Sequence, residues 1–310
     1  MENKILGLHH VTAIAGNAQQ NMDFYTKILG LRLVKKTVNF DDPGTYHFYF
    51  GDGKGTPGTI LTFFPWEKIR SGVTGTGMIS SVNYSVPPES FEFWQERFKK
   101  YKVKYDEVNE KFGEKFLSLR DPDGLKINLV AMNGDEREPW HTNEVNETVA
   151  TRGFHSVTLL LQQAAPTVKV LTDILGYELQ TQQGSNYRLS TNEVDTASVI
   201  DITETNGAAR GINSAGTYHH VAFRVKDDEV LMEYREKVLR AGLHITPKID
   251  RDYFFSLYFR EPGGVLFEIA TDNPGFTRDE ALDELGTHLK LPKQYEPSRK
   301  QIEAVLPVLA

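Results

Sequence analysis

The sequence has no cysteine among its 310 residues. This absence excludes disulfides, thiolate nucleophiles, zinc–thiolate sites and iron–sulfur clusters, so any metal must be bound by His, Asp, Glu, backbone or water. The chain also lacks an apolar run of the roughly 20 residues that a membrane-spanning helix needs. Its first residues do not have the layout of a signal peptide. We therefore expect a cytoplasmic protein without a membrane partner.

An excess of positive charge is missing as well. The net charge is −7, with acidic and basic residues interleaved, whereas nucleic acids and anionic membranes attract basic surfaces. Hydrophobic residues make up 39% and charged residues 25%, which is the profile of a globular protein. We expect no nucleic-acid partner, and the formation of a homo-oligomer is left open.

The chain repeats one layout four times. Each repeat begins with a short β-prone run, at residues 8–14, 80–86, 154–160 and 218–225. A helical stretch follows each run, at residues 21–29, 88–101, 168–175 and 229–241, and glycines at positions 30, 176 and 242 suit the ends of three of them. Strands then close the units, most plainly as hairpins over residues 116–129 and 256–269 with Pro and Gly in the turn.

This repeat predicts an α+β fold made of four βαβββ modules. We expect an N-terminal pair of modules in residues 1–140, a C-terminal pair in residues 151–275 and a tail in residues 276–310. The acidic stretch of residues 133–150 lacks periodicity and looks like the connector between the halves. Within the tail, residues 298–305 predict a short capped helix.

Two columns of the aligned repeats carry candidate metal ligands. The first-strand column holds His10, Ser81, Ser156 and His220, and the last-strand column holds Thr62, Asn128, Asp201 and Glu268. The fourth unit alone has both a histidine and a glutamate, and the first unit adds a histidine. A carboxylate in the middle of an apolar strand is costly to bury unless its charge is compensated, and a divalent cation would do so.

Each of these residues also has a simpler interpretation. A lone histidine at a strand start is usually a hydrogen-bonded core or edge residue, and Glu268 could pair with Arg224 or Arg260. Strand alternation would place His220 on the concave side of a sheet and His219 with the apolar residues that pack on helices. The metal hypothesis rests on three side chains in matching columns and on the doubled His-His pair in units one and four.

Two imidazoles and one carboxylate are typical of a non-haem Fe(II) site with open positions for other ligands. Zinc and Mn(II) accept the same set of ligands. The residues alone therefore indicate a type of site and leave the metal open.

Several segments are similar to those of a known family. They lie at residues 8–12, 33–47, 58–66, 219–220, 250–254, 258–261 and 266–272. With them the chain resembles the vicinal oxygen chelate superfamily, which includes glyoxalases and extradiol dioxygenases. Within it, the chain is most similar to hydroquinone ring-cleaving dioxygenases, such as dichlorohydroquinone 1,2-dioxygenases and Bacillus-type enzymes of quinone and methylhydroquinone resistance. The similarity extends to residues 294–297 and so covers nearly the whole chain.

The resemblance implies a function and a ligand set. It assigns the metal to the second histidine of each pair, His10 and His220, together with Glu268. It implies Fe(II) as the metal, with Mn(II) as the other candidate, and O₂ and a hydroquinone-type phenol as substrates. It also implies that units one and four pair into the metal-bearing barrel and that units two and three form a second barrel.

Further residues are assigned to the surroundings of the metal by the same resemblance. His9 and His219 match flanking histidines, while Arg251 and Tyr258 fall at positions that face the substrate. Tyr258 also has a local argument, because residues 258 and 268 are equidistant from a hairpin turn and would be cross-strand neighbours. The alternatives are a half-buried sheet aromatic for Tyr258, a solvated loop for Arg251, and packing between strand and helix for His9 and His219.

Three functions are compatible with these features. The main prediction is an Fe(II)-dependent dioxygenase that cleaves the aromatic ring of hydroquinone-type phenols with O₂. A glyoxalase-type isomerase or lyase would need a metal and a base but no O₂, and a metal-free resistance protein would bind a small aromatic without reaction. The intact ligand trio argues against the last. The histidines at positions 47, 141, 155, 244 and 288 show no partner pattern, and we expect no role for them.

Overall fold

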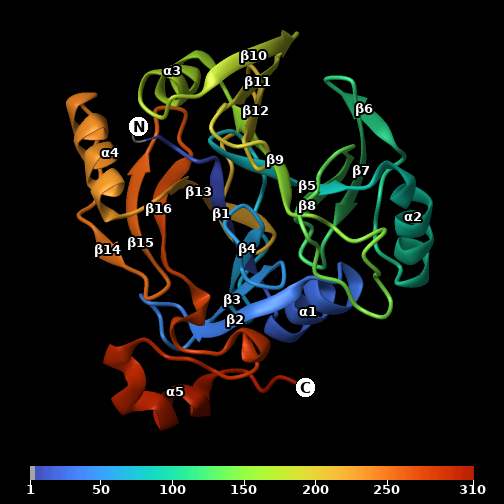
Figure 1. Ribbon diagram of the computed structural model, residues 1–310, viewed down its shortest axis with the longest axis vertical. Coiled ribbons are helices and arrows are strands. Elements are labelled where there is room, and N and C mark those ends of the chain that lie inside the picture. The colour runs from blue at the N-terminus through green and yellow to red at the C-terminus, as the bar shows by residue number, and fades with distance from the viewer. Residues whose placement is uncertain (1–3) are drawn as a thin grey trace.

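Two curled eight-stranded sheets form the frame of the protein, and each combines two of the four repeats (Figure 1). The first sheet has the strand order β14-β15-β16-β13-β1-β4-β3-β2 and joins the fourth unit to the first. The second sheet has the order β10-β11-β12-β9-β5-β8-β7-β6 and joins the third unit to the second. The computed structural model of the protein describes residues 4–310.

The strands and helices have the following bounds. The first sheet consists of β1 (Leu8–Ala15), β2 (Arg32–Val38), β3 (Tyr46–Gly51), β4 (Ile60–Pro65), β13 (Thr217–Val225), β14 (Ile249–Asp250), β15 (Phe254–Arg260) and β16 (Leu266–Pro274). The second consists of β5 (Met78–Val86), β6 (Asn109–Lys111), β7 (Glu114–Arg120), β8 (Lys126–Ala131), β9 (Phe154–Leu161), β10 (Glu178–Gln183), β11 (Asn186–Ser190) and β12 (Val199–Glu204). The units contribute α1 (Ala18–Asp23) with η1 (Phe24–Ile28), η2 (Pro88–Ser90) with α2 (Phe91–Lys100), α3 (Ala165–Asp173) and α4 (Asp228–Arg240). The tail contributes η3 (Phe276–Arg278), η4 (Leu282–Glu284), η5 (Lys293–Ser298) and α5 (Arg299–Val305).

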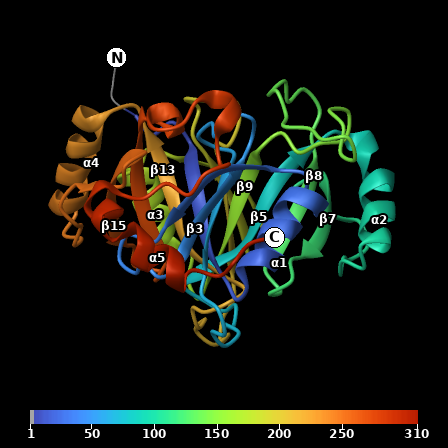
Figure 2. The ribbon, with the colours of Figure 1, turned by 90° about the horizontal axis from the view of Figure 1, so that it is seen from below.

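Each unit places its first strand beside its last. β1 runs parallel to β4, and β13 runs parallel to β16, because the helix and the remaining strands of the unit form the crossover between them. β1 and β13 pair antiparallel at the centre of the first sheet, as β5 and β9 do in the second. On the convex side, residues such as Val11, Val221 and Phe223 are fully buried in the apolar core. Helices α2 and α4 lie on the outer sides of the molecule, so the concave faces remain for polar side chains (Figure 2).

The predicted α+β fold and the pairing of units are confirmed. The register places Thr12 beside Thr62, Ala222 beside Glu268, Asn83 beside Asn128 and Thr158 beside Asp201. In all four units the last-strand column therefore lies beside the residue two positions after the first-strand column, as the alignment of the repeats requires. The division of the chain into residues 1–140, 151–275 and 276–310 stays a prediction. Each sheet contains strands from both halves of the chain, so the two sheets do not correspond to these segments.

The first helix begins earlier than the pattern predicted. It starts at Ala18 rather than near residue 21, because the side chain of Asn17 accepts a hydrogen bond from the backbone N–H of Gln20 and caps the helix. Its last turn widens into the π-helix η1 before Gly30, which takes a positive φ of 71°. The sequence signal for this helix start was Asn17, a preferred N-cap residue, three residues before Gln20.

A bulge interrupts each of the four central strands at the same position. In the first sheet the register steps from Leu8–Phe223 to His10–Ala222, and from Thr12–His220 to Ala13–Tyr218. His9 and His219 are thus the extra, unpaired residues. In the second sheet Ser80 and His155 are skipped in the same way. Because a bulge re-aims a side chain, strand alternation does not hold at these four residues.

The tail closes the free edge of the first sheet along β2. Leu289 bridges to Lys36, and the backbone N–H of Lys290 donates to the carbonyl of Lys36. The ammonium group of Lys35 is fully buried and pairs with the carboxylates of Asp279 and Glu280. The predicted helix at the end of the tail is present as α5, but the predicted cap is wrong. Ser298 belongs to the preceding 3₁₀-helix, and its side chain makes no capping hydrogen bond.

Among residues 4–310, no helix combines the length and the hydropathy that crossing a bilayer would require.

The hydroxyl group of Tyr218 links the two sheets. Tyr218 belongs to β13, accepts a hydrogen bond from the backbone N–H of Val82 on β5 and donates one to the carbonyl of Lys126 at the start of β8. Its side chain is buried, so no water replaces these partners.

We expect the substitution Tyr218→Phe to lower the free energy of unfolding by about 1–3 kcal/mol, because it leaves a buried N–H without an acceptor. Tyr84→Phe is the matched control. The hydroxyl of Tyr84 is buried without a hydrogen-bond partner, so its removal should be neutral or stabilising. Urea unfolding followed by circular dichroism measures both, and equal effects of the two substitutions would contradict this role of Tyr218.

Candidate metal centre

Three of the predicted residues meet on the concave face of the first sheet. His10 comes from β1, His220 from β13 and Glu268 from β16. The Nε2 atom of His220 is 2.8 Å from Oε2 of Glu268, and that of His10 is 3.2 Å from the same oxygen. The two Nε2 atoms are 3.4 Å apart. All three side chains are buried, with Glu268 fully so.

These distances fit a single bound cation. Two ligand atoms about 2.1 Å from one ion, at angles between about 90° and 110°, are about 3.0–3.4 Å apart, and the three separations here are close to that range. Oε2 of Glu268 is buried and has no hydrogen bond of acceptable geometry. An unpartnered carboxylate oxygen facing two imidazole nitrogens is unfavourable unless a positive charge lies between them.

The tautomer of His10 follows from its neighbour His9. The Nε2 atom of His9 is 3.1 Å from the carbonyl oxygen of Thr271, which can only accept, so Nε2 of His9 carries the proton. Burial, followed by the charge of His10, lowers the pKa of His9 well below its ordinary value, so its ring is neutral and Nδ1 accepts. Nδ1 of His10 lies 2.9 Å away and must donate. In the neutral ring that binds a metal, Nε2 of His10 then keeps its lone pair.

His219 and His220 form the corresponding pair on β13. Their Nδ1 atoms are 2.8 Å apart. If His220 binds a metal through Nε2, its Nδ1 carries the proton and donates to Nδ1 of His219. The proton of His219 is then on Nε2. Burial, and next the charge of His220, lowers the pKa of His219 to about 3, so this ring is neutral as well.

The carboxylate of Glu268 is held in place by Ser256 on β15, whose hydroxyl donates to Oε1 in a short hydrogen bond. Burial alone would raise the pKa of Glu268, but the nearby His10 and His220 outweigh it and hold the pKa well below its ordinary value. The alternative pairing of Glu268 with an arginine is wrong. Arg224 pairs with Asp272, and Arg260 donates to a backbone carbonyl of its own hairpin turn.

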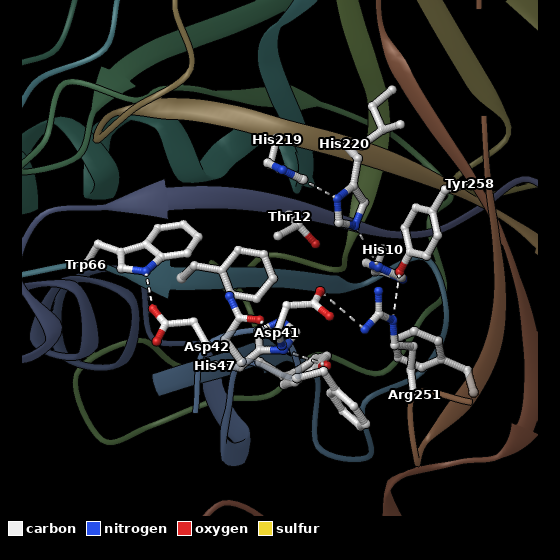
Figure 3. Close-up of a pocket in the computed structure, with 16 residues that line it drawn as sticks. His10, Thr12, Asp41, Asp42, His47, Trp66, His219, His220, Arg251 and Tyr258 are labelled. Carbon is white, nitrogen blue, oxygen red and sulfur yellow. Dashed lines mark hydrogen bonds and ion pairs between the residues drawn. The ribbon is translucent and has the colours of Figure 1, made fainter. Parts of the chain in front are cut away.

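His10 and His220 line a pocket of about 360 Å³, and Glu268 is buried behind them (Figure 3). The pocket wall is formed by His10, Thr12, Asn39, Phe40, Asp41, Asp42, His47, Tyr49, Phe64, Trp66, His219, His220, Arg251, Phe254, Tyr258 and Leu266. Aromatic rings make up much of this wall, and the acidic groups lie on the side of the Asn39–Asp42 loop. The volume is near the lower end of the roughly 300–1,000 Å³ that small-molecule sites have.

Arg251 and Tyr258 form one unit of the pocket wall. The Nε–H of Arg251 donates to the hydroxyl of Tyr258 over 3.3 Å, and its guanidinium also lies 5.4 Å from the centre of the Phe40 ring. Tyr258 is the cross-strand neighbour of Glu268, as its position in the hairpin predicted, and its ring meets that of His220 edge-on at 5.6 Å. Burial, and next the charge of Glu268, raises the pKa of Tyr258, so the phenol is protonated. Arg251 is thus partly buried in the pocket wall and not in a solvated loop.

Two histidines of the pocket were not placed there by the strand patterns. Strand alternation put His219 with the residues that face the helices, but the bulge turns its side chain into the pocket beside His220, as the resemblance implied. His47, for which no role was expected, lines the same pocket from β3. On β3, His47 and Tyr49 alternate with the apolar residues Phe48 and Phe50. This alternation was the sequence pattern that could have placed His47 on the concave face. His9 lies behind His10 rather than in the pocket wall.

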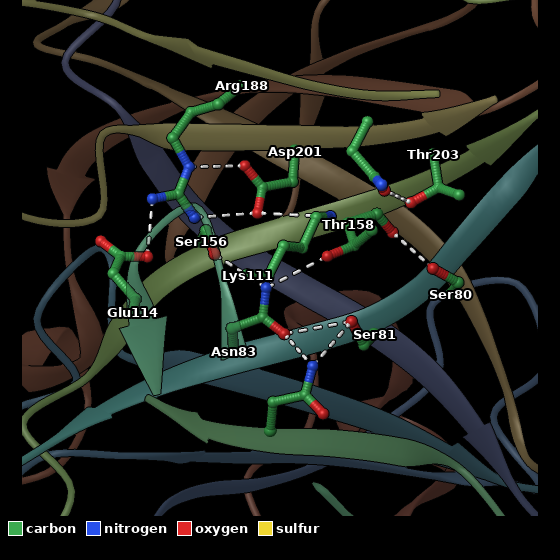
Figure 4. Close-up of polar contacts among 12 residues, drawn as sticks. Ser80, Ser81, Asn83, Lys111, Glu114, Ser156, Thr158, Arg188, Asp201 and Thr203 are labelled. Carbon is green, nitrogen blue, oxygen red and sulfur yellow. Dashed lines mark hydrogen bonds and ion pairs between the residues drawn. The ribbon is translucent and has the colours of Figure 1, made fainter. Parts of the chain in front are cut away.

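The second sheet replaces the ligand trio with amides and hydroxyls (Figure 4). The side-chain amide of Asn128 donates to Oδ1 of Asn83, whose own amide donates to Ser156. Arg188 binds Asp201 with two hydrogen bonds and Glu114 with a third. Among residues 4–310, the cluster of His10, His220 and Glu268 is the one group of at least three His or acidic side chains close enough to share an ion.

Comparisons with known proteins agree with this fold. The chain matches the Glyoxalase/Bleomycin resistance protein/Dioxygenase superfamily over residues 7–129 and 153–269. The chain belongs to this superfamily. It is 46% identical to the "Putative ring-cleaving dioxygenase MhqO" of Bacillus subtilis, with 98% of this chain and 96% of the relative covered.

Two further members are informative. A "Chlorohydroquinone/hydroquinone 1,2-dioxygenase" from Sphingobium indicum is 37% identical, with 97% of this chain and 96% of that protein covered. A crystal structure of a "putative dioxygenase" from Bacillus subtilis is 45% identical and superposes with a TM-score of 0.95 over 100% of this chain and 99% of that one. The predictions of the superfamily, of its fold and of a dioxygenase enzyme are confirmed. The roles of individual site residues and the identity of the metal stay predictions.

The buried histidines make the metal-free protein sensitive to acid. Burial is the largest cause that lowers the pKa values of His9, His47, His219 and His220, whereas histidine in an unfolded chain has a pKa of about 6.5. Below pH 6.5 the unfolded state therefore binds more protons than the folded state, and stability falls as the pH falls.

We expect the free energy of unfolding of the metal-free protein to decrease between about pH 6.5 and pH 5, by up to about 1.4 kcal/mol per pH unit for each histidine that stays neutral. Ordinary carboxylates are still ionised over this range and do not account for the slope. Asp121, whose pKa burial raises to about 7, opposes it by at most one proton, so the histidines set its sign. Urea unfolding at several pH values measures it. A constant free energy of unfolding across the range would contradict the neutral, buried state of these rings.

Proposed function

We propose that this protein is an Fe(II)-dependent dioxygenase that cleaves the aromatic ring of hydroquinone-type phenols with O₂. The observation that carries the proposal is a buried set of two histidines and one glutamate at the end of an aromatic-lined pocket of the size of a small ring compound. Such a set leaves several positions of a six-coordinate ion open on one side. The names of the relatives support the choice of an aromatic substrate and O₂.

The proposed ligands are His10, His220 and Glu268, each held by a neighbour. His9, His219 and Ser256 fix the three ligand groups through hydrogen bonds, which orients their lone pairs before a metal binds. When bound, Fe(II) supplies Lewis acidity toward a phenol oxygen and the electron transfer that O₂ chemistry requires.

Other residues of the pocket bind the substrate and handle its protons. The Nε2–H group of His219 and the phenol of Tyr258 line the pocket on either side of His220, and each can donate a hydrogen bond to an oxygen of the substrate. Arg251 supports the phenol of Tyr258 and places a positive charge where negative charge develops. Phe64, Phe254 and Trp66 provide apolar surface for the ring and exclude water.

Anaerobic loading of the protein with Fe(II), followed by O₂-uptake measurements with methyl-, chloro- and unsubstituted hydroquinones and with catechols, tests the proposal. We expect uptake of one O₂ per substrate consumed and loss of the aromatic absorbance. Substrate binding without O₂ uptake would contradict the proposal and favour a glyoxalase-type isomerase or lyase.

The substitution Glu268→Gln should lower metal affinity by at least about 100-fold, because it removes the charge that offsets the cation while it keeps the shape. Asp201→Asn is the matched control. Asp201 is a buried acid at the corresponding position of the second sheet, where it pairs with Arg188. The control should keep one metal ion per chain and normal O₂ uptake even if it unfolds more easily. Metal content by plasma mass spectrometry separates the two, and unchanged metal content in Glu268→Gln would exclude this ligand.

The charges at the pocket suggest which rings enter it. Asp41 and Asp42 line the wall, and hydrogen bonds from Trp66 and Thr45 hold the pKa of Asp42 below its ordinary value, so it is ionised. Arg251 is the cation of the wall, and Asp41 lies 3.7 Å from it. Uncharged hydroquinones should therefore be preferred over rings that carry a carboxylate.

We expect methylhydroquinone to have a higher kcat/KM than 2,5-dihydroxybenzoate, and Asp41→Asn to narrow the difference by about threefold or more, because one negative charge is removed and Arg251 is released. Steady-state O₂ uptake at low and high ionic strength measures the ratio. A ratio that neither the substitution nor salt changes would show that shape, and not charge, excludes the carboxylated ring.

A further inference from the structure

Four polar side chains form a continuous hydrogen-bonded chain in the wall of the metal pocket. The hydroxyl of Thr12 is 2.8 Å from that of Thr62, and the hydroxyl of Thr62 is 2.9 Å from Nε2 of His47. The hydroxyl of Tyr49 is 3.0 Å from Nδ1 of His47. All four side chains are buried, and Thr12, His47 and Tyr49 line the pocket. The metal ligands and their direct supports do not include any of these groups.

The chain occupies the place in unit one that Glu268 and Ser256 occupy in unit four. Tyr49 pairs with Thr62 across β3 and β4, as Tyr258 pairs with Glu268 across β15 and β16. His47, two residues before Tyr49, corresponds to Ser256, two residues before Tyr258. Ser256 donates to the ligand Glu268, and His47 contacts Thr62. One half of the sheet thus supports a metal ligand, and the other half supports Thr12.

The direction of the hydrogen bonds is fixed at Tyr49. Within residues 4–310 its hydroxyl has no hydrogen-bond partner besides His47, so it donates to Nδ1. His47 is neutral because burial lowers its pKa, and its proton is therefore on Nε2, which donates to Thr62. Thr62 then donates to Thr12. The opposite direction would leave the buried O–H of Tyr49 without an acceptor, at a cost of about 1–3 kcal/mol.

The series of hydrogen bonds ends at Thr12. Within the described residues, the hydrogen of its hydroxyl has no acceptor. Thr12 is two residues after His10 on the same strand and lies in the pocket close to the histidines (Figure 3). Because Thr62 donates to the oxygen of Thr12, the O–H of Thr12 is free to donate to a ligand. A fixed donor in a water-poor pocket stabilises an oxygen atom that gains negative charge during a reaction.

We propose that His47 is a positioning residue, which together with Tyr49 and Thr62 holds the Thr12 hydroxyl as a hydrogen-bond donor to an oxygen atom bound beside the metal ligands. This assignment rests on the proposed dioxygenase function. The expected effect is on kcat more than on KM, since the interaction strengthens as charge develops on that oxygen.

A double-mutant cycle tests whether His47 acts through Thr12. Thr12→Val should lower kcat by up to about 100-fold, which is the lower end of the range for the loss of one such donor. His47→Leu should lower kcat by a similar or smaller factor, and the double variant should be no worse than Thr12→Val alone. His47→Gln should restore part of the activity, because its amide supplies both a donor and an acceptor. Factors that multiply in the double variant would overturn the proposal.

His155→Leu is the matched control for lost packing. His155 has the same exposed fraction of 8% as His47 and also makes two side-chain hydrogen bonds, to Ser156 and Glu114, but it lies in the second sheet. It should lower the melting temperature as His47→Leu does, while kcat stays unchanged. A drop in kcat for both histidine variants would show that the effect of His47→Leu is only a loss of stability.

A measurement of the His47 tautomer is independent of activity. In metal-free protein labelled with ¹⁵N histidine, NMR should show a proton on Nε2 of His47 and a bare Nδ1, and Tyr49→Phe should shift the Nδ1 resonance because its donor is gone. A proton on Nδ1 would reverse the chain and overturn the proposal. If the wild type shows no O₂ uptake with any hydroquinone, the proposed function fails, and the tautomer still decides the direction of the chain.

Discussion

The antiparallel pairing of β1 with β13 is the contact on which the rest of the structure depends. It brings the first and fourth units into one sheet, although most of the chain lies between them. His10 and His220 become neighbours on its concave face, and β16, which runs parallel to β13, adds Glu268 from the next strand. The aromatic pocket follows from the same curvature, since β3, β4 and β15 bend around these central strands.

The polar groups around the ligands behave as linked sets rather than as separate contacts. The carbonyl of Thr271 determines which nitrogen of His9 carries a proton, and His9 in turn determines the lone pair of His10. In the other half of the sheet, the hydroxyl of Tyr49 likewise determines which nitrogen of His47 carries the proton. Each set begins at a group that can form its hydrogen bond in one direction, the carbonyl of Thr271 or the hydroxyl of Tyr49. Each set ends at a side chain of the site, His10 or Thr12. Burial is what makes this control effective, because water cannot supply a substitute partner.

The fold and the ligand trio were predictable from the sequence because both depend on the repeat. Once the four units were aligned, His10, His220 and Glu268 stood out as departures from a shared pattern, and the hairpin turn placed Tyr258 opposite residue 268. The orientation of His219 was not predictable in this way, since a bulge breaks the alternation on which the argument relied. His47 was missed because its partner Thr62 lies on another strand, and no sequence spacing predicts a hydrogen bond between the two side chains. The early start of α1 was missed for a smaller reason, the cap at Asn17.

The bulges have a consequence for how the centre comes into being. Ser80 and His155 interrupt the second sheet at the same positions as His9 and His219 interrupt the first, yet the second sheet has no ligand trio. The distortion is therefore a property of the strand pairing and does not need an ion to produce it. The proposed cation would meet a site whose backbone is already shaped, so its binding would cost little conformational entropy. Its loss and reloading would then leave the fold unchanged, and the occupancy of the proposed site would follow the supply of metal.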